Sequence, residues 1–215
     1  MMEKIILFQG DSITDGGRDR ENPMHTGRCY AHFVKNELSV DYPNQFIYYN
    51  RGVSGNRIVD LYARIRSDFI NLKPDYASIL IGVNDVWHGI RSNNGVDTQK
   101  FERVYDWMLQ EILEECPGIK LMLISPFVVP GTATCDTEEQ PDRWERFRIG
   151  VAEKAAVTKK MAGKYDLPLI ELQPVFDKLQ ESAPAEYWVR DGVHPTEAGY
   201  TVIKRLWVDA FRKIL

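Results

Sequence analysis

Short polar segments at the two ends of the sequence carry residue types that can cleave an ester. Ser12, in the segment Gly10 to Ser12 near the N-terminus, can act as a nucleophile, and His194 near the C-terminus can take its proton. Asp191 stands three residues before His194, close enough to hold the imidazole in one tautomer. A serine, a histidine and an aspartate in these roles form a catalytic triad. The sequence therefore predicts ester hydrolysis by Ser12, Asp191 and His194.

The same chemistry needs hydrogen-bond donors aimed at the developing oxyanion. The backbone N–H of Ser12 is one candidate, because this residue follows a predicted strand directly. Gly55 can bring its backbone N–H close to a substrate, since it has no side chain in the way. Asn84 can contribute its side-chain amide. We expect Ser12, Gly55 and Asn84 to form an oxyanion hole.

Other residues near these segments have a second interpretation. Trp87 and Trp188 could stack on a sugar ring, although packing in the core is an equally good explanation for each. Ser54 lies in a Gly-Val-Ser-Gly-Asn run that lacks the spacing of a nucleophile elbow, so we expect a turn residue there. Asp11 and Asp85 are expected to hold their loops by hydrogen bonds rather than to react.

A hydrolytic metal site is the alternative interpretation of Asp191 and His194. It would recruit Asp11, Asp15 and Asp85. The remaining histidines are scattered along the chain, which favours surface or supporting roles and argues against this alternative; they are His25, His32 and His88. We therefore expect no metal and no other cofactor.

The elements that must position these residues alternate between short apolar runs and longer amphipathic stretches. This pattern predicts a three-layer α/β/α, doubly wound sheet of about five parallel strands, in one domain over residues 1–215. The expected strands are residues 4–8, 46–49, 77–81, 121–124 and 167–172. The expected helices are residues 30–40, 58–71, 98–115, 143–165 and 196–215.

The site should lie beyond the carboxyl ends of the strands, because ligands bind there in open α/β sheets. Three of the chemically interesting segments follow predicted strands directly, and the fourth precedes the last helix. The irregular segment 128–142, which contains Pro130, Gly131 and Pro141, is expected to be a surface loop and a rim over the site.

Composition excludes several other classes of function. The chain has a net charge of −4 and no basic run, which argues against a nucleic-acid partner. No stretch approaches the roughly 20 apolar residues of a membrane span. The N-terminal residues lead straight into the first motif without a signal-peptide cleavage site, so we expect a cytoplasmic protein. Cys29, Cys116 and Cys135 include no CxxC pair and are expected to be free thiols.

Taken together and in order, the four segments resemble the signature blocks of the SGNH (GDSL-type) hydrolases. These blocks are Gly-Asp-Ser, a glycine after the second strand, Gly-x-Asn-Asp and Asp-x-x-His, and here they span residues 10–195. The resemblance implies a flavodoxin-like fold, with Ser12 as nucleophile, Gly55 and Asn84 in the oxyanion hole, and Asp191 with His194 completing the triad.

Within that family, the amino-acid sequence around the blocks is similar to that of intracellular acetylxylan esterases and related carbohydrate acetylesterases. The similar runs are GDSITDGGR, NRGVSGNRIVDL, IGVNDVWHG, ISPFVVPG and RDGVHPTEAGY. This resemblance implies deacetylation of xylo-oligosaccharides or related small carbohydrate esters through an acyl-enzyme, and a homo-oligomer. A lysophospholipase or thioesterase of the same family is the first alternative, and a metal-dependent phosphohydrolase is the alternative from another class.

Overall fold

A parallel sheet of five strands forms the centre of the computed structural model, which describes residues 3–215. The strands lie in the order β2-β1-β3-β4-β5, and every neighbouring pair is parallel. This confirms the fold class expected from the sequence. The strands are β1 (Lys4–Gly10), β2 (Phe46–Asn50), β3 (Tyr76–Leu80), β4 (Lys120–Ile124) and β5 (Leu169–Ile170).

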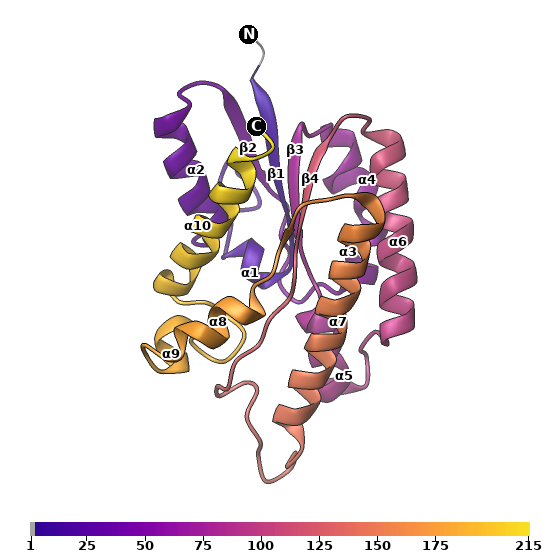
Figure 1. Cartoon of the computed structure of the whole chain (residues 1–215). Helices are drawn as coiled ribbons and strands as arrows, with labels where there is room; N and C mark the ends of the chain where they lie inside the picture. The colour runs from indigo at the N-terminus through magenta and orange to yellow at the C-terminus, as the bar shows by residue number, and fades with distance from the viewer. Residues whose placement is uncertain (1–2) are drawn as a thin grey trace.

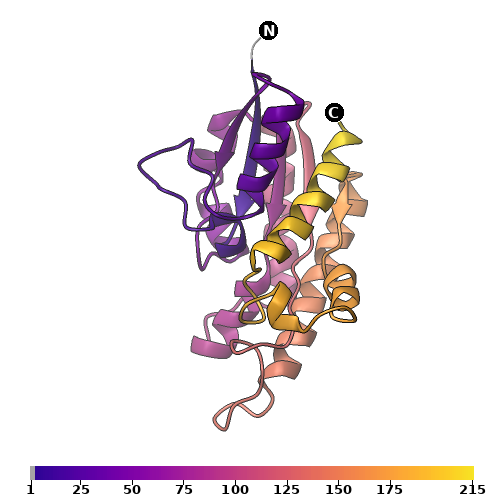
Figure 2. The ribbon, with the colours of Figure 1, turned by 90° about the vertical axis from the view of Figure 1, so that its left-hand side faces the viewer.

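The sheet is covered on both faces, because successive side chains of a strand point to opposite sides. In β1, Ile6 and Phe8 pack with helices of one layer, whereas Leu7 packs with helices of the other. Helices α2 (Tyr30–Asp41) and α10 (Glu197–Arg212) form the first layer (Figures 1 and 2). The second layer contains α3 (Ile58–Ala63), α4 (Ile65–Asp68), α6 (Thr98–Glu115) and most of α7 (Arg143–Tyr165).

The shorter helices gather at the carboxyl ends of the strands, in the lower part of Figure 1. They are α1 (Ser12–Asp15), α5 (Val83–Ser92), α8 (Gln173–Leu179) and α9 (Ala185–Trp188). At this end the chain leaves β1 toward β2 and returns to β3 on the other side of β1. Such a reversal of strand order opens a crevice in doubly wound sheets, and here it lies beside α1.

Two of the predicted elements are divided or shortened in the structure, and helices α5, α8 and α9 lie where no helix was predicted. The helix expected over residues 58–71 is divided into α3, α4 and the short 3₁₀ helix η1 (Ile70–Leu72). The division falls at Arg64, whose guanidinium holds Asn56, the Arg51 carbonyl and Asp68 from a non-helical backbone position. The fifth strand, predicted over residues 167–172, covers only Leu169–Ile170.

The segment 128–142 is irregular and mostly at the surface, as predicted, but it begins with two buried residues. Val128 and Val129 are buried, and the N–H of Val129 donates to the carbonyl of Gly192. The N–H of Ala133 donates to the carbonyl of Asp191. The segment therefore supports the Asp191 turn from behind instead of forming a rim, because none of its residues lines a cavity that contains Ser12.

In the part of the chain that the structure describes, no helix has the length and apolar character needed to cross a membrane. All three cysteines are free thiols, as predicted.

Candidate active site

The sequence folds so that Ser12 is the first residue of α1, directly beyond β1. Asp11 caps this helix, with its Oδ1 accepting the N–H of Ile13 at 2.9 Å. The first N–H groups of a helix have no intrahelical partner. The N–H of Ser12 has none elsewhere in residues 3–215 either, so it remains available as a donor.

Ser12, His194 and Asp191 form a continuous hydrogen-bonded chain. The Oγ of Ser12 lies 2.9 Å from Nε2 of His194, and Nδ1 of His194 lies 2.7 Å from Oδ2 of Asp191. Partial burial raises the pKa of Asp191, but hydrogen bonds from the His194 ring and from the backbone N–H groups of His194 and Val193 outweigh it and hold the pKa well below its usual value. The ionised carboxylate fixes the proton on Nδ1, which leaves Nε2 free to accept the Ser12 proton.

The turn that carries Asp191 and His194 is closed by its own backbone. An antiparallel bridge joins Val189 to Pro195, and the N–H of Arg190 donates to the His194 carbonyl at 2.9 Å. Gly192 has a φ of +101°, a conformation that favours glycine. The turn therefore presents the imidazole from a rigid support.

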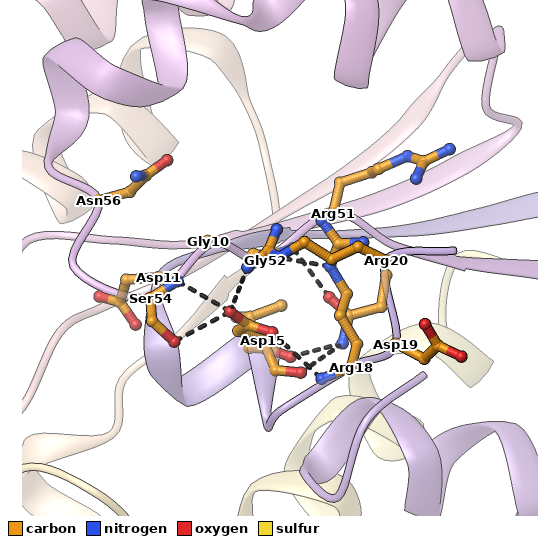
Figure 3. Close-up of polar contacts among 12 residues, drawn as sticks. Gly10, Asp11, Asp15, Arg18, Asp19, Arg20, Arg51, Gly52, Ser54 and Asn56 are labelled. Carbon is orange, nitrogen blue, oxygen red and sulfur yellow. Dashed lines mark hydrogen bonds and ion pairs between the residues drawn. The ribbon is translucent and has the colours of Figure 1, made fainter. Parts of the chain in front are cut away.

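The loop after β2 supplies the second expected oxyanion donor. Gly55 has a φ of +84°, and its N–H is not engaged by any group among residues 3–215. Ser54, in a turn as predicted, is fixed by Asp15, whose Oδ2 accepts both its N–H and its hydroxyl at 2.9 Å (Figure 3). Arg20 binds the same carboxylate oxygen at 2.8 Å. Asp15 thus ties the loop of Gly55 to the helix of Ser12.

Gly52 and Asn50 strengthen the same connection. Gly52 lies so close to α1 that a Cβ added to it would clash with the backbone nitrogen of Asp15. The buried Asn50 amide donates to the carbonyls of Thr14 and Thr26, and its Oδ1 accepts the N–H of Gly52 at 2.8 Å. Neither role was predicted from the sequence, because the partners lie many residues away along the chain.

Asn84 lies in the first turn of α5, the helix that follows β3. One N–H of its side-chain amide donates to the carbonyl of Asn56 at 3.1 Å, which orients the group. The amide has a second N–H, and the residue lines the same cavity as Ser12, Gly55 and His194. The structure therefore brings all five residues of the predicted triad and oxyanion hole to one place.

Asp11 and Asp85 hold local structure, as predicted. Both are buried, and burial raises the pKa of Asp11 to about 7 and that of Asp85 to about 8. The carboxylate of Asp85 accepts the N–H of Ile58 at the start of α3. Oδ2 of Asp11 has no hydrogen-bond partner within the described residues.

Of the two candidate sugar-stacking tryptophans, only Trp87 lies at the site. It lines a cavity of about 570 Å³ together with Ser12 and His194, and its ring lies 5.9 Å from the His194 ring. Trp188 lines neither cavity at Ser12; its Nε1 donates to the carbonyl of Leu179, and its ring contacts Tyr187. These contacts favour the packing interpretation of Trp188 over sugar stacking.

The histidines outside the triad are spread over the molecule. His25 accepts the N–H of Asp19, and His32 contacts Asn36, both away from Ser12. His88 lines the cavity, where burial and the charge of Arg57 lower its pKa. Over residues 3–215, no group of three or more His, Cys, Asp or Glu side chains is arranged to hold a metal ion.

Comparison with known proteins places these features in a family. A family profile described as GDSL-like lipase/acylhydrolase matches residues 8–202. The chain is 31% identical over 210 residues to an acetylxylan esterase of Geobacillus stearothermophilus, covering 94% of this chain and 91% of that protein. These matches confirm the resemblance deduced from the motifs.

Solved structures agree with this relationship. A putative GDSL-like lipase from Parabacteroides merdae superposes with a TM-score of 0.86 and 32% identity, over 98% of this chain and 97% of the other. The acetylxylan esterase Axe2 from Geobacillus stearothermophilus superposes with a TM-score of 0.83 and 28% identity, over 96% and 93%. The fold is therefore shared with these structures.

Proposed function

Because the chain belongs to the GDSL-like lipase/acylhydrolase family and is a carboxylic ester hydrolase, we propose that it removes acetyl groups from xylo-oligosaccharides or related carbohydrates, with Ser12 as nucleophile. The observation that carries the proposal is the hydrogen-bonded chain from Ser12 through His194 to Asp191, with distances of 2.9 Å and 2.7 Å.

In the first half of the reaction, Oγ of Ser12 attacks the carbonyl carbon of the acetyl group while its proton passes to Nε2 of His194. Asp191 stabilises the imidazolium that forms. The oxyanion accepts hydrogen bonds from the N–H groups of Ser12 and Gly55 and from the Asn84 amide. Collapse of this intermediate breaks the bond to the sugar oxygen, which takes the proton from Nε2 and leaves as a hydroxyl.

In the second half, water attacks the acetyl-enzyme on Ser12. His194 accepts a proton from that water, and the same donors stabilise the second oxyanion. The bond between the acetyl carbon and Oγ then breaks, and Oγ recovers its proton from Nε2. Acetate is released and the free enzyme is restored without any cofactor.

The choice of an acetylated carbohydrate is supported by the similarity to the Geobacillus stearothermophilus acetylxylan esterase. Trp87 offers an aromatic face beside His194, where a sugar ring can stack. An esterase for longer acyl chains is the other candidate in this family, and chain-length preference separates the two.

The proposal is tested by acetate release from acetylated xylo-oligosaccharides, with p-nitrophenyl acetate and p-nitrophenyl octanoate measured in parallel. We expect the wild type to release acetate and to prefer the short ester, and Ser12→Ala to do neither. Ser182→Ala, which removes an exposed hydroxyl bonded to the Leu179 carbonyl, is the matched control. Substantial turnover by Ser12→Ala would contradict the mechanism, whereas a preference for octanoate would contradict the acetyl specificity.

A further inference from the structure

A second cavity of about 550 Å³ opens from Ser12 and His194 on the side of α10. It contains Ser12 but neither Gly55 nor Asn84, so it extends away from two of the three expected oxyanion donors. Its wall includes two arginines, Arg28 and Arg190, both exposed to solvent. A substrate bound at Ser12 that extends into this cavity comes close to both arginines.

The backbone holds the two arginines on the catalytic segments themselves. The N–H of Arg28 donates to the carbonyl of Gly16, which ends α1, at 2.7 Å. The N–H of Arg190 donates to the carbonyl of His194 at 2.9 Å. The backbone of Arg28 is therefore attached to the helix of Ser12, and that of Arg190 to the turn of His194. 

Neither arginine is neutralised by the protein. In residues 3–215, no salt bridge involves Arg28 or Arg190, whereas Arg20, Arg57 and Arg64 each bind an aspartate. The charges of Arg28 and Arg190 therefore remain available for a ligand.

Among the residues that line the two cavities at Ser12, arginines outnumber carboxylates. Glu197 is the single carboxylate in the wall of the second cavity, and it stands against two arginines. The wall of the first cavity contains Arg91, which is also free of salt bridges among the described residues, and it includes no Asp or Glu. This local excess of positive charge occurs in a chain with a net charge of −4.

We propose that Arg28 and Arg190 bind an anionic group on the alcohol part of the substrate, so that the enzyme prefers acetylated sugars that carry a carboxylate or phosphate. The inference rests on the proposed function: an acetyl group is uncharged, so the anion must belong to the part that leaves. Guanidinium groups match the planar geometry of carboxylate and the oxygens of phosphate, and they attract anions to a cleft from a distance.

The test uses three methyl acetyl-glucosides that differ only at carbon six, which carries a hydroxymethyl, a carboxylate or a phosphate group. The measured quantity is the ratio of kcat/KM for an anionic ester to that for the neutral ester. We expect a ratio of about five or more for the wild type at low ionic strength, and a fall toward one as salt is added. Whichever anion gives the higher ratio identifies the source of the charge.

Three variants make the prediction specific. The double variant Arg28→Gln/Arg190→Gln should bring the ratio close to one, and Glu197→Gln should raise it, because a repelling carboxylate is removed. Arg148→Gln is the matched control: Arg148 is exposed, forms no salt bridge within residues 3–215, and lines a different cavity, so its variant should keep the wild-type ratio. A wild-type ratio near one, or a ratio that survives in the double variant, would overturn the proposal.

A binding measurement separates this proposal from the proposed function. Methyl glucuronide should inhibit hydrolysis of p-nitrophenyl acetate more strongly than methyl glucoside, and the double variant should lose the difference. If the sugar acetates are not cleaved but this difference is present, the assignment of an acetylated carbohydrate as substrate fails and the anion site stands. If the neutral sugar acetate is cleaved and the difference is absent, the anion site fails alone.

Discussion

The carboxylate of Asp15 accepts both the backbone N–H and the hydroxyl of Ser54, each at 2.9 Å. Asp15 belongs to the helix that begins with the nucleophile, and Ser54 precedes the glycine that supplies an oxyanion donor. One buried side chain therefore sets the distance between the attacking oxygen and one of the groups that stabilise its product (Figure 3).

We predict that Asp15→Asn lowers kcat by about 10²-fold, because small misplacements of catalytic groups have effects of that size. In the wild type, the two carboxylate oxygens of Asp15 accept the N–H groups of Arg18 and Ser54. The NH₂ group of an asparagine would face one of these N–H groups with a donor in place of an acceptor. KM should change much less, since Asp15 does not line either cavity at Ser12. Ser54→Ala, which removes only the hydroxyl contact, should have a smaller effect. An Asp15→Asn variant with normal folding by circular dichroism and wild-type kcat would contradict the positioning role.

Asn84 and Asn50 should respond in opposite ways when replaced by alanine. Asn84→Ala should lower kcat by about 10²–10³-fold with little loss of stability, because its amide serves the oxyanion. Asn50→Ala should instead lower the free energy of unfolding by about 1–3 kcal/mol for each buried backbone group left unpaired. Steady-state kinetics and urea unfolding of both variants check this; equal losses of kcat and stability in the two would refute the division of roles.

Asp11 should make stability depend on pH. Burial raises its pKa from 3.8 to about 7, so the folded protein binds this proton more tightly than the unfolded chain. Between those values the folded state holds more protons, and the contribution of Asp11 to stability therefore falls as pH rises from about 4 to about 7 and is constant above that. Asp11→Asn has no such titration and keeps an oxygen for the Ile13 N–H.

The stability of Asp11→Asn relative to the wild type should therefore increase between about pH 4 and pH 8, by a few kcal/mol. Urea unfolding across this range measures the difference, in which the other titrating groups cancel. Asp209→Asn, at an exposed position on α10, controls for the loss of a carboxylate in general. A difference that stays constant with pH would show that Asp11 is not perturbed in the folded state.

Gly52→Ala should destabilise the protein by about 1–3 kcal/mol, the usual cost of forcing an atom into filled space. The added Cβ would meet the backbone of Thr14 and Asp15, which cannot move without disturbing Ser12. Gly163→Ala is the matched control, because nothing lies within 4 Å of its added Cβ and the residue is inside α7. It should stabilise by about 0.5–1 kcal/mol. Thermal unfolding of both variants measures these changes in stability. A Gly52→Ala variant with wild-type stability and full activity would contradict the close packing.

The strands and the contact between Asp191 and His194 could be predicted from the sequence because their signals are local. An apolar run such as Ile5 to Phe8 indicates a buried strand by itself, and the Asp191 to His194 spacing lies within a single turn. Helix α5 was not predicted, although Val83, Val86 and Ile90 follow a helical spacing; its polar first turn was interpreted as part of a loop.

The supporting contacts could not be predicted, because each joins distant parts of the chain. Nothing around Asn50 indicates that its amide meets Thr14, and nothing around Asp15 indicates that it holds Ser54. The break of the helix at Arg64 is of the same kind: neither proline nor glycine marks it, and the guanidinium contacts that accompany it reach residues outside the helix. Local sequence thus indicates the candidate reacting groups, and long-range packing decides how they are held.

Ser12 and His194 lie 182 positions apart, and α10, which follows His194, packs Trp207 against Phe8 of the first strand. Because a chain is synthesised from its N-terminal side, Ser12 leaves the ribosome well before His194. A nascent chain therefore carries Ser12 without its proposed base while the 182 positions between them are added, and the proposed triad can form only after the segment that carries His194 has emerged.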